Sequence, residues 1–339
     1  MPEPRCRLVS LDATPHYHVV SRCVRRQFLC GFDRDTGRDF SHRRDWIRAR
    51  IFKLADIFAV DICAYAVMSN HVHLVLTIRQ DVAIAWDERE VARRWLRLFG
   101  GRKEVKHWLA GQRQSEAQAA AALEWIKTYR ERLFDLSWFM RCLNEPIARM
   151  ANEEDNVTGR FWEGRFKSQA LLDEAALLSL MAYVDLNPIR AGIAATSEES
   201  DYTSLQQRVI ETRIQDAPEQ KNDLPKDLKA ALGKLAPFAP ESGLREDNAL
   251  PVTLADYLEL VDWTGRAIAH GTKGMIDDRL PPILERLKAR PEGVVEFLSK
   301  PQKRRAPNVI GPVQALKDCA QAFGRTFLKG RATATLLFG

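Results

Sequence analysis

The sequence predicts an α+β protein whose strands all lie before about residue 205. Three observations support this class. Short runs rich in β-branched residues alternate between polar and apolar positions, which is typical of strands. Two of these runs are joined by only three residues, a connection short enough for an antiparallel hairpin. Beyond residue 205, apolar residues recur at the spacing of helices and no longer at that of strands.

The first half of the chain alternates strands with one helix. The strands are expected at His16 to Cys23, Ile57 to Val67 and His71 to Ile78. Met68, Ser69 and Asn70 form the turn of the hairpin between the last two. Residues 42–55 place apolar side chains at helical spacing opposite a basic face, which predicts an amphipathic helix.

The next segment brings helices and one further strand. Residues 81–135 are charged and rich in alanine, which predicts a helical insertion without strands. A helix is expected at 136–152 despite Pro146, and 157–172 should be a loop that enters a strand. Asp173 suits the N-cap of a helix that runs to Asn187, where Pro188 ends it.

The chain divides into three parts. We expect one domain over 1–205, a Pro- and charge-rich linker over 206–251, and an all-α accessory domain of unknown role over 252–339. Thr253 and Asp256 resemble a capping box at the start of the first C-terminal helix. The helices of this domain are expected at 253–269, 281–289, 291–299 and 312–327.

Charge is distributed unevenly. The net charge of +6 indicates little by itself, but the first fifty residues hold eleven arginines and no lysine against six acidic residues. Planar guanidinium groups suit bidentate recognition of phosphate. A solvated charged surface is the alternative interpretation.

Cysteine and hydropathy patterns exclude several classes. The six cysteines form no CxxC pair, which argues against a zinc ribbon and against a secreted disulfide scaffold. No run approaches the roughly 20 apolar residues of a membrane span, and the N-terminus lacks an apolar signal core. We therefore expect a soluble cytoplasmic protein without a membrane partner.

Two pairs of residues suggest a reactive site. Side chains alternate along a strand, so His71 and His73 point the same way and could hold a divalent metal. Tyr183 and Asn187 lie one turn apart beside the apolar stripe of their helix. Each pair also fits an ordinary structural role. The HxH pattern is short, and it occurs a second time at His16 and His18.

HVH at 71–73, together with YVDLNPIRAG at 183–192, resembles the single-tyrosine HUH transposases, in the branch called REP-associated tyrosine transposases. YHVVSR at 17–22, YAVMSNHVHLVL at 65–76 and GRFWEGRFKS at 159–168 extend the resemblance in the order that the family shows. It covers roughly the first 200 residues, apart from the insertion.

The resemblance implies a ferredoxin-like antiparallel sheet with flanking helices. It implies that His71, His73 and Asn187 bind Mg²⁺ or Mn²⁺, although relatives often carry Gln at the third position. Tyr183 would then nick and rejoin single-stranded DNA at hairpins through a 5′-phosphotyrosine intermediate. A homodimer that exchanges the tyrosine helix is one assembly that the resemblance allows.

Candidate DNA contacts cluster around the GRFWEGRFKS segment, where charge is interleaved with aromatic residues. Core packing and solvated charge remain the alternative for each residue alone. KPQKRR at 300–305 could be a further patch but fits a linker better. The candidate DNA-binding residues are Arg22, Arg25, Arg26, Arg160, Trp162, Arg165 and Lys167.

Two other functions stay open. One is a domesticated protein that binds DNA hairpins but no longer cuts them. The other is a zinc hydrolase that uses an HxH pair, which would need further His or Asp ligands on neighbouring strands. The sequence identifies no general base for Tyr183, because Asp185 lies on a different face of the helix.

Overall fold

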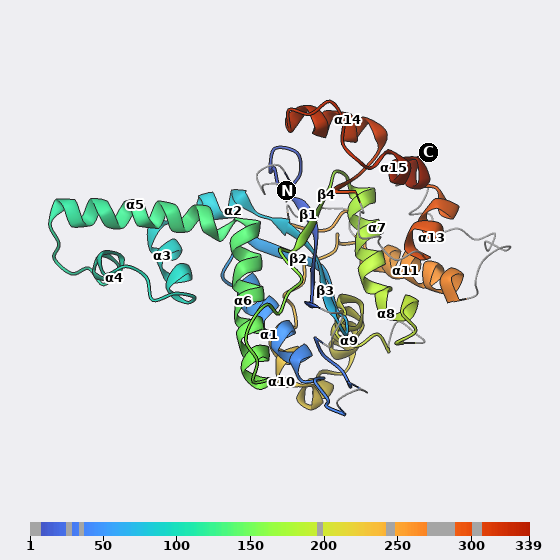
Figure 1. The fold of residues 1–339 in the computed structure, drawn as a ribbon, viewed down its shortest axis with the longest axis horizontal. Coiled ribbons are helices and arrows are strands. Elements are labelled where there is room, and N and C mark those ends of the chain that lie inside the picture. The colour runs from blue at the N-terminus through green and yellow to red at the C-terminus, as the bar shows by residue number, and fades with distance from the viewer. Residues whose placement is uncertain are drawn as a thin grey trace.

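A computed structural model describes residues 8–24, 29–33, 37–194, 199–241, 248–269, 289–299 and 307–339. Within them lies a five-stranded mixed sheet in the order β2-β3-β1-β4-β5 (Figure 1). All neighbouring strands are antiparallel except β4 and β5, which are parallel. The α+β class is thereby confirmed. The strands are β1 (His16–Arg22), β2 (Val60–Val67), β3 (His71–Ile78), β4 (Lys167–Leu171) and β5 (Val309–Ile310).

Strands β2 and β3 form the expected hairpin, closed by a hydrogen bond from Met68 N–H to the His71 carbonyl at 2.9 Å. The central strand β1 pairs His18 with Val75 of β3 on one side and with Gln169 of β4 on the other. Because residues directly opposite in a ladder share a face, the register places His16, His18, His71, His73 and Gln169 on one face of the sheet.

Helices cover both faces of this sheet. Helices α1 (Arg43–Ala55) and α6 (Leu136–Glu154) share one core with Tyr17, Val19 and Leu74. Helix α7 (Glu174–Asp185) packs on the other face, with Cys63, Ala66 and Val75. Figure 1 shows α6 and α7 on opposite sides of the strands. The histidine face therefore looks toward α7.

Pro146 lies inside α6, as expected, without ending it. Proline has no N–H, so the Cys142 carbonyl one turn earlier loses its helical donor. Arg50 of α1 supplies the missing donor through its Nε at 2.9 Å. The interruption in one helix thus becomes a contact between two helices.

The basic face predicted for α1 is only partly exposed. Arg43 is buried and bonds to Glu154 at 2.6 Å and to Asp155 at 2.7 Å. Arg48 is also buried and pairs with Asp227 at 2.6 Å. A buried guanidinium needs such partners, because an isolated buried charge is very costly. These arginines hold the fold together and are not free to contact DNA.

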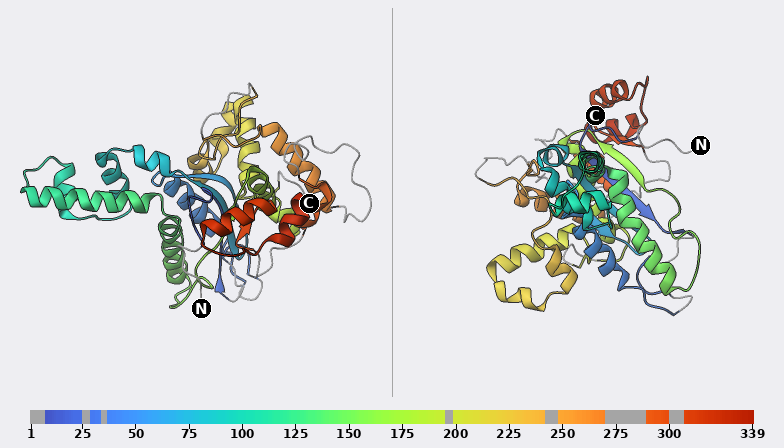
Figure 2. Two further views of the ribbon diagram at one scale, coloured as in Figure 1. Left: turned by 90° about the horizontal axis from the view of Figure 1, so that it is seen from above. Right: turned by 90° about the vertical axis from the view of Figure 1, so that its left-hand side faces the viewer.

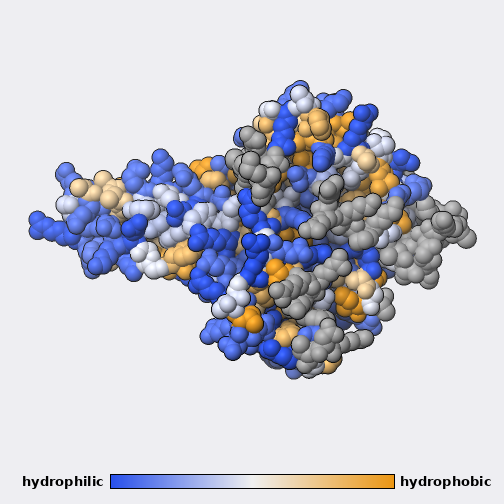
Figure 3. Space-filling view, in the orientation of Figure 1, coloured by the Kyte–Doolittle hydropathy of each residue, from blue (hydrophilic) through white to orange (hydrophobic). Residues whose placement is uncertain are grey.

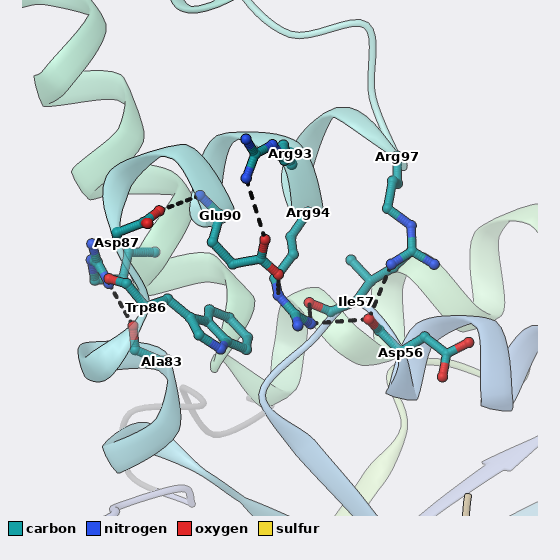
Figure 4. A network of polar contacts seen from close by, with 10 residues as sticks. Asp56, Ile57, Ala83, Trp86, Asp87, Glu90, Arg93, Arg94 and Arg97 are labelled. Atoms are coloured by element: carbon teal, nitrogen blue, oxygen red, sulfur yellow. Dashed lines mark hydrogen bonds and ion pairs between the residues drawn. The ribbon is translucent and has the colours of Figure 1, made fainter. Parts of the chain in front are cut away.

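The expected helical insertion forms an arm that projects from the sheet (Figures 1 and 2). Hydrophilic residues cover most of the arm's visible face (Figure 3). A polar network attaches the base of the arm to the end of α1 (Figure 4). Arg94 donates one hydrogen bond to the Asp56 carbonyl at 3.0 Å and another to the Glu90 carboxylate at 2.7 Å. The arm comprises α2 (Gln80–Ala85), α3 (Glu88–Leu96), α4 (Lys103–Leu109) and α5 (Glu116–Leu133).

Residues 206–241 and 248–251, which lie in the range expected to be a linker, pack against the rest of the fold. They follow the start of α9 (Ser204–Asp216) and contain the 3-10 helix η3 (Pro218–Asp223) and α10 (Lys226–Ala231). Ala236 N–H donates to the Ile62 carbonyl of β2 at 2.8 Å. The buried Arg208 donates to the Cys63 carbonyl at 2.9 Å. The described part of this range is therefore packed against β2.

The C-terminal region is mostly helical but contributes strand β5, so the expectation of an all-α region is corrected. Thr253 and Asp256 exchange hydrogen bonds at the start of α11, as expected. The helix expected at 281–289 and the basic run 300–305 lie outside the described residues, apart from position 289. The described helices are α11 (Leu254–Ala269), α13 (Pro291–Ser299), α14 (Val313–Ala322) and α15 (Arg331–Phe338).

Two further expectations concern the whole chain. The five cysteines in the described ranges are all free and buried. Across those ranges, no helix has both the length and the apolar character that a membrane crossing requires.

Candidate active site

The histidine face brings together His18, His71 and His73. The ring centroids of His71 and His73 are 4.7 Å apart, and those of His18 and His73 are 5.1 Å apart. Burial lowers the pKa of His18 to about 4 and holds the pKa of His73 well below its ordinary value. Burial, and then the charges of Arg22 and Arg190, lower the pKa of His71 to about 3. All three rings are therefore neutral at about pH 7, and the neutral ring is the form that binds metals.

Hydrogen bonds on Nδ1 orient both rings of the HVH pair. His71 Nδ1 lies 2.5 Å from Asn70 Oδ1, and His73 Nδ1 lies 2.9 Å from His18 Nε2. His73 Nε2 is buried and has no hydrogen-bond partner among the described residues. An unpartnered buried polar atom is costly unless a ligand satisfies it. This atom is the strongest indication of a binding site on the sheet.

Tyr183 reaches the same place from α7. Asp173 caps that helix by accepting from Ala176 N–H at 2.8 Å, as expected. The Tyr183 ring centroid lies 5.9 Å from that of His73 and 6.3 Å from that of His18. Tyr183 is only 2% exposed, and the Phe297 ring of α13 lies 6.0 Å from it. The tyrosine and the histidines of one chain are thus neighbours in a closed site.

Asn187 begins α8 (Asn187–Arg190), which continues α7 after a short break. Its Nδ2 donates to the Tyr183 carbonyl at 3.0 Å, and its Oδ1 accepts from Arg190. The Arg190 guanidinium carbon lies 4.6 Å from the centroid of the Tyr183 ring. Gly192 follows with φ +67°, a conformation that lets the chain leave the helix. The segment therefore positions a cation directly over the tyrosine.

Positive charge surrounds the HVH pair. Arg22 lies opposite His71 in the sheet, and Lys167 lies opposite Val20 on the same face. The charges of Arg22, Arg190 and Lys167 all lower the pKa of His71. Two predicted DNA-binding residues are therefore beside the histidines, and such charges suit a phosphate group.

The other predicted DNA-binding residues are less closely connected with this site. Trp162 is half-buried, and its Nε1 donates to the Asn144 carbonyl at 2.9 Å. Backbone pairing between residues 22–24 and 161–163 brings it next to Arg22. Arg160 and Arg165 are exposed, whereas Phe166 is buried in the core. Arg25 and Arg26 lie outside the described residues.

Other polar groups near α7 have structural roles. Asp185 is buried, accepts from Tyr257 Oη at 2.6 Å and Leu205 N–H at 2.9 Å, and also accepts from Ser204. Burial raises the pKa of Asp185. The hydroxyls of Tyr65 and Tyr202 bond to Gln207 and Asp45, and Tyr65 packs with Leu74 in the core on the other face of the sheet. Tyr257 and Trp263 belong to the core.

The residues present fit a divalent metal in part. His71 and His73 each use Nδ1 for a hydrogen bond, which leaves Nε2 of both rings available to a metal. Nε2 of His73 has no hydrogen-bond partner among the described residues. Asn187 would join only after its oxygen leaves Arg190. No group of three or more His, Cys, Asp or Glu side chains that could hold a metal occurs in the described residues. A zinc hydrolase therefore lacks its further ligands there.

Three residues of this site carry no assigned role in the sequence prediction. Arg190 is inside the YVDLNPIRAG segment, but an arginine after a helix break has no distinctive periodicity. The second HxH pattern does mark His18, although its function needs the sheet register. Gln169 has no sequence signal at all, because it meets His18 only through the β1–β4 ladder.

Comparison with protein-family models finds no match, and no curated protein matches the sequence. Among solved structures, the chain is similar to one described as the REP-associated tyrosine transposase bound to a REP hairpin. The two share 12% sequence identity, with a TM-score of 0.35 over 58% of this chain and 79% of that chain. Similarity at this level is distant and does not establish a shared activity.

Proposed function

We propose that this protein nicks and rejoins single-stranded DNA at hairpin sites, with Tyr183 as the nucleophile. The proposal depends on the close approach of the Tyr183 ring to the HVH pair. The Tyr183 ring lies 5.9 Å from His73, whose Nε2 is buried and unpartnered among the described residues. Core packing alone does not require a buried, unsatisfied imidazole nitrogen beside a tyrosine.

His71 and His73 would hold Mg²⁺ or Mn²⁺, which when bound would polarise the scissile phosphate. Arg22, Lys167 and Arg190 would neutralise the phosphate charge. The Tyr183 oxygen would then form a bond to phosphorus while the bond to the 3′ oxygen breaks. Tyr183 gives up its phenolic proton, and the leaving 3′ oxygen takes one up. The reverse reaction with a second DNA end rejoins the strand, because the phosphodiester energy is kept in the tyrosine ester.

Arg190 also suits the tyrosine itself. Its guanidinium carbon is 4.6 Å from the ring centroid, and Asn187 holds it there. A cation in this place would stabilise the phosphate charge next to the attacking oxygen.

One observation favours the alternative, a hairpin-binding protein that no longer cuts. Tyr183 and His73 are only 2% and 3% exposed, so a phosphate cannot reach them without movement. Hairpin binding through Arg22 and Lys167 would not need such movement. Only a measurement of covalent chemistry separates the two functions.

The test is to incubate the protein with Mn²⁺ and labelled single-stranded hairpins, and to look for a denaturant-resistant protein–DNA adduct. Tyr183→Phe should keep the hairpin affinity and lose the adduct, because it removes only the phenolic oxygen. Hairpin binding without adduct in the unmodified protein, across palindromes of the host genome, would establish the non-cleaving alternative.

A further inference from the structure

His18 lies at the middle of a hydrogen-bonded chain that ends on His73. Gln169 Nε2 donates to the Pro307 carbonyl at 2.7 Å, which turns Gln169 Oε1 toward His18 Nδ1 at 2.6 Å. His18 Nε2 in turn lies 2.9 Å from His73 Nδ1, with the two ring planes parallel to within 1°. His18 and His73 are 1% and 3% exposed, so water does not compete for these bonds.

The donor and acceptor roles along this chain follow from its first member. A backbone carbonyl accepts only, so the Gln169 amide nitrogen must face Pro307. The Gln169 oxygen then requires a proton on His18 Nδ1. A neutral imidazole has one N–H, so His18 Nε2 is an acceptor and His73 Nδ1 must donate to it. The remaining lone pair of His73 is on Nε2, the unpartnered atom beside Tyr183.

We infer that His18 is a positioning residue that, together with Gln169, holds His73 in the Nδ1–H tautomer and keeps its Nε2 lone pair ready for a divalent cation. The inference rests on the metal site of the proposed function. Metal-bound histidines are commonly oriented in this way by a partner on the second ring nitrogen. Here the partner is a second histidine, and its own tautomer is set by a glutamine.

Strand β5 holds Pro307, the last member of this hydrogen-bonded series, in place. Ala170 N–H donates to the Asn308 carbonyl at 2.8 Å, and Leu172 N–H donates to the Ile310 carbonyl at 2.9 Å. These bonds hold Pro307 beside Gln169. The C-terminal segment therefore contributes to the tautomer of a histidine on β3, which gives its two-residue strand a role in the site.

The tautomer can be read directly in the metal-free protein. Long-range ¹H–¹⁵N spectra of histidine-labelled protein at about pH 7 should show His18 and His73 neutral, each with its proton on Nδ1. Loss of the corresponding signals in His18→Gln and His73→Gln would assign them. In Gln169→Leu, the acceptor for His18 is lost, and the Nε2–H form of His73 should appear. A proton on Nε2 of His73 in the unmodified protein would overturn the inference.

Metal affinity gives the second readout, measured with Mn²⁺ alone by electron paramagnetic resonance. His18→Leu should weaken Mn²⁺ binding about 10- to 100-fold, the usual effect of losing such a partner. His18→Gln offers an acceptor oxygen to His73 Nδ1 and should bind Mn²⁺ more tightly than His18→Leu. His16→Gln is the matched control, because His16 lies on the same face of β1 but bonds to Thr77 at 2.8 Å.

The outcomes separate the two proposals. Equal Mn²⁺ affinity in His18→Leu, His18→Gln and the unmodified protein would overturn the positioning role even if DNA cleavage is found. Absence of Mn²⁺ binding in the unmodified protein would contradict the metal site of the proposed function. The tautomer of His73 in the metal-free protein would still show whether the hydrogen bonds that begin at Gln169 determine the position of its proton.

Discussion

At the residue scale, His73 and Asn187 should contribute to cleavage very differently. His73→Ala removes a metal ligand and should slow adduct formation by two or more orders of magnitude, because a bound Lewis acid contributes several kcal/mol to transition-state stabilisation. Asn187→Ala removes one weak amide, which water can replace, and should slow it less. Single-turnover adduct formation with Mn²⁺ measures both. If both variants slow adduct formation equally, Asn187 acts together with the histidines, through Arg190 or the metal.

The same histidines should make stability depend on pH. The pKa of His18 is lowered to about 4 in the fold and is about 6.5 in the unfolded chain, so acid protonates the unfolded chain first. The stabilising effect of a neutral His18 is present above about pH 6.5 and is lost as the pH falls toward about 4. Between about pH 7 and about pH 5, His18 should lower the free energy of unfolding by about 2 kcal/mol.

Urea unfolding at these two pH values measures the effect. His18→Gln should show a smaller loss of the free energy of unfolding on acidification than the unmodified protein. His107→Gln is the control, because His107 is exposed on the arm and should leave the pH dependence unchanged. A pH dependence that is identical in all three proteins would contradict the burial-induced shift of His18.

Part of the site could be predicted from residue patterns alone. The alternation along one strand places His71 and His73 together, and helical spacing places Asn187 one turn after Tyr183. Their meeting depends on α7 packing over the sheet, which no local pattern shows. The contacts of Gln169 and Arg190 depend on neighbours across a ladder and across a helix break, so they could only come from the structure.

At the element scale, α13 closes the site over the tyrosine. Phe297 on this helix lies 6.0 Å from the Tyr183 ring, centroid to centroid, and Tyr183 is 2% exposed. We predict that Phe297→Ala makes adduct formation faster, because less of α13 must move before a phosphate reaches the phenol. Truncating a large buried side chain should also lower the free energy of unfolding, by about 3 kcal/mol.

Val294→Ala provides the matched control for that variant. Val294 is buried on the same helix, but it has no ring to place against Tyr183. It should destabilise the protein without speeding adduct formation. Equal acceleration in both variants would attribute the effect to general loosening of α13 and not to uncovering of the tyrosine.

Most elements before residue 200 could be predicted because their side chains repeat with a clear period. β1, β2, β3, α1 and α7 all lie close to their expected positions. Strand β5 has only two residues, too few for a period, and it pairs with a strand far away in the sequence. The buried Arg43 and Arg48 were missed for a related reason, since their carboxylate partners come from α6 and α10.

At the scale of the whole molecule, the net charge of +6 does not show how much positive charge is concentrated beside the histidines. Arg22, Lys167 and Arg190 gather at the histidines, whereas the buried arginines of α1 are neutralised within the fold. We predict that Lys167→Gln weakens hairpin binding and reduces the slope of log affinity against log salt by about 0.7 to 0.9.

Fluorescence anisotropy over a salt series measures this slope. Lys127→Gln is the control, because Lys127 is exposed on α5 of the projecting arm (Figure 1). It should leave the slope unchanged. If Lys127→Gln reduces the slope as much as Lys167→Gln does, the contacts with the DNA backbone are not confined to the histidine face.

If Tyr183 is the nucleophile, it becomes covalently joined to DNA. The most direct measurement is mass spectrometry of the protein–DNA adduct after protease and nuclease digestion, with the DNA labelled on either side of the cut. We predict a nucleotide attached through its 5′ phosphate to the peptide that contains Tyr183, and a free 3′ hydroxyl on the other fragment. A nucleotide on another residue, such as Tyr17, Tyr65 or Tyr202, would contradict it.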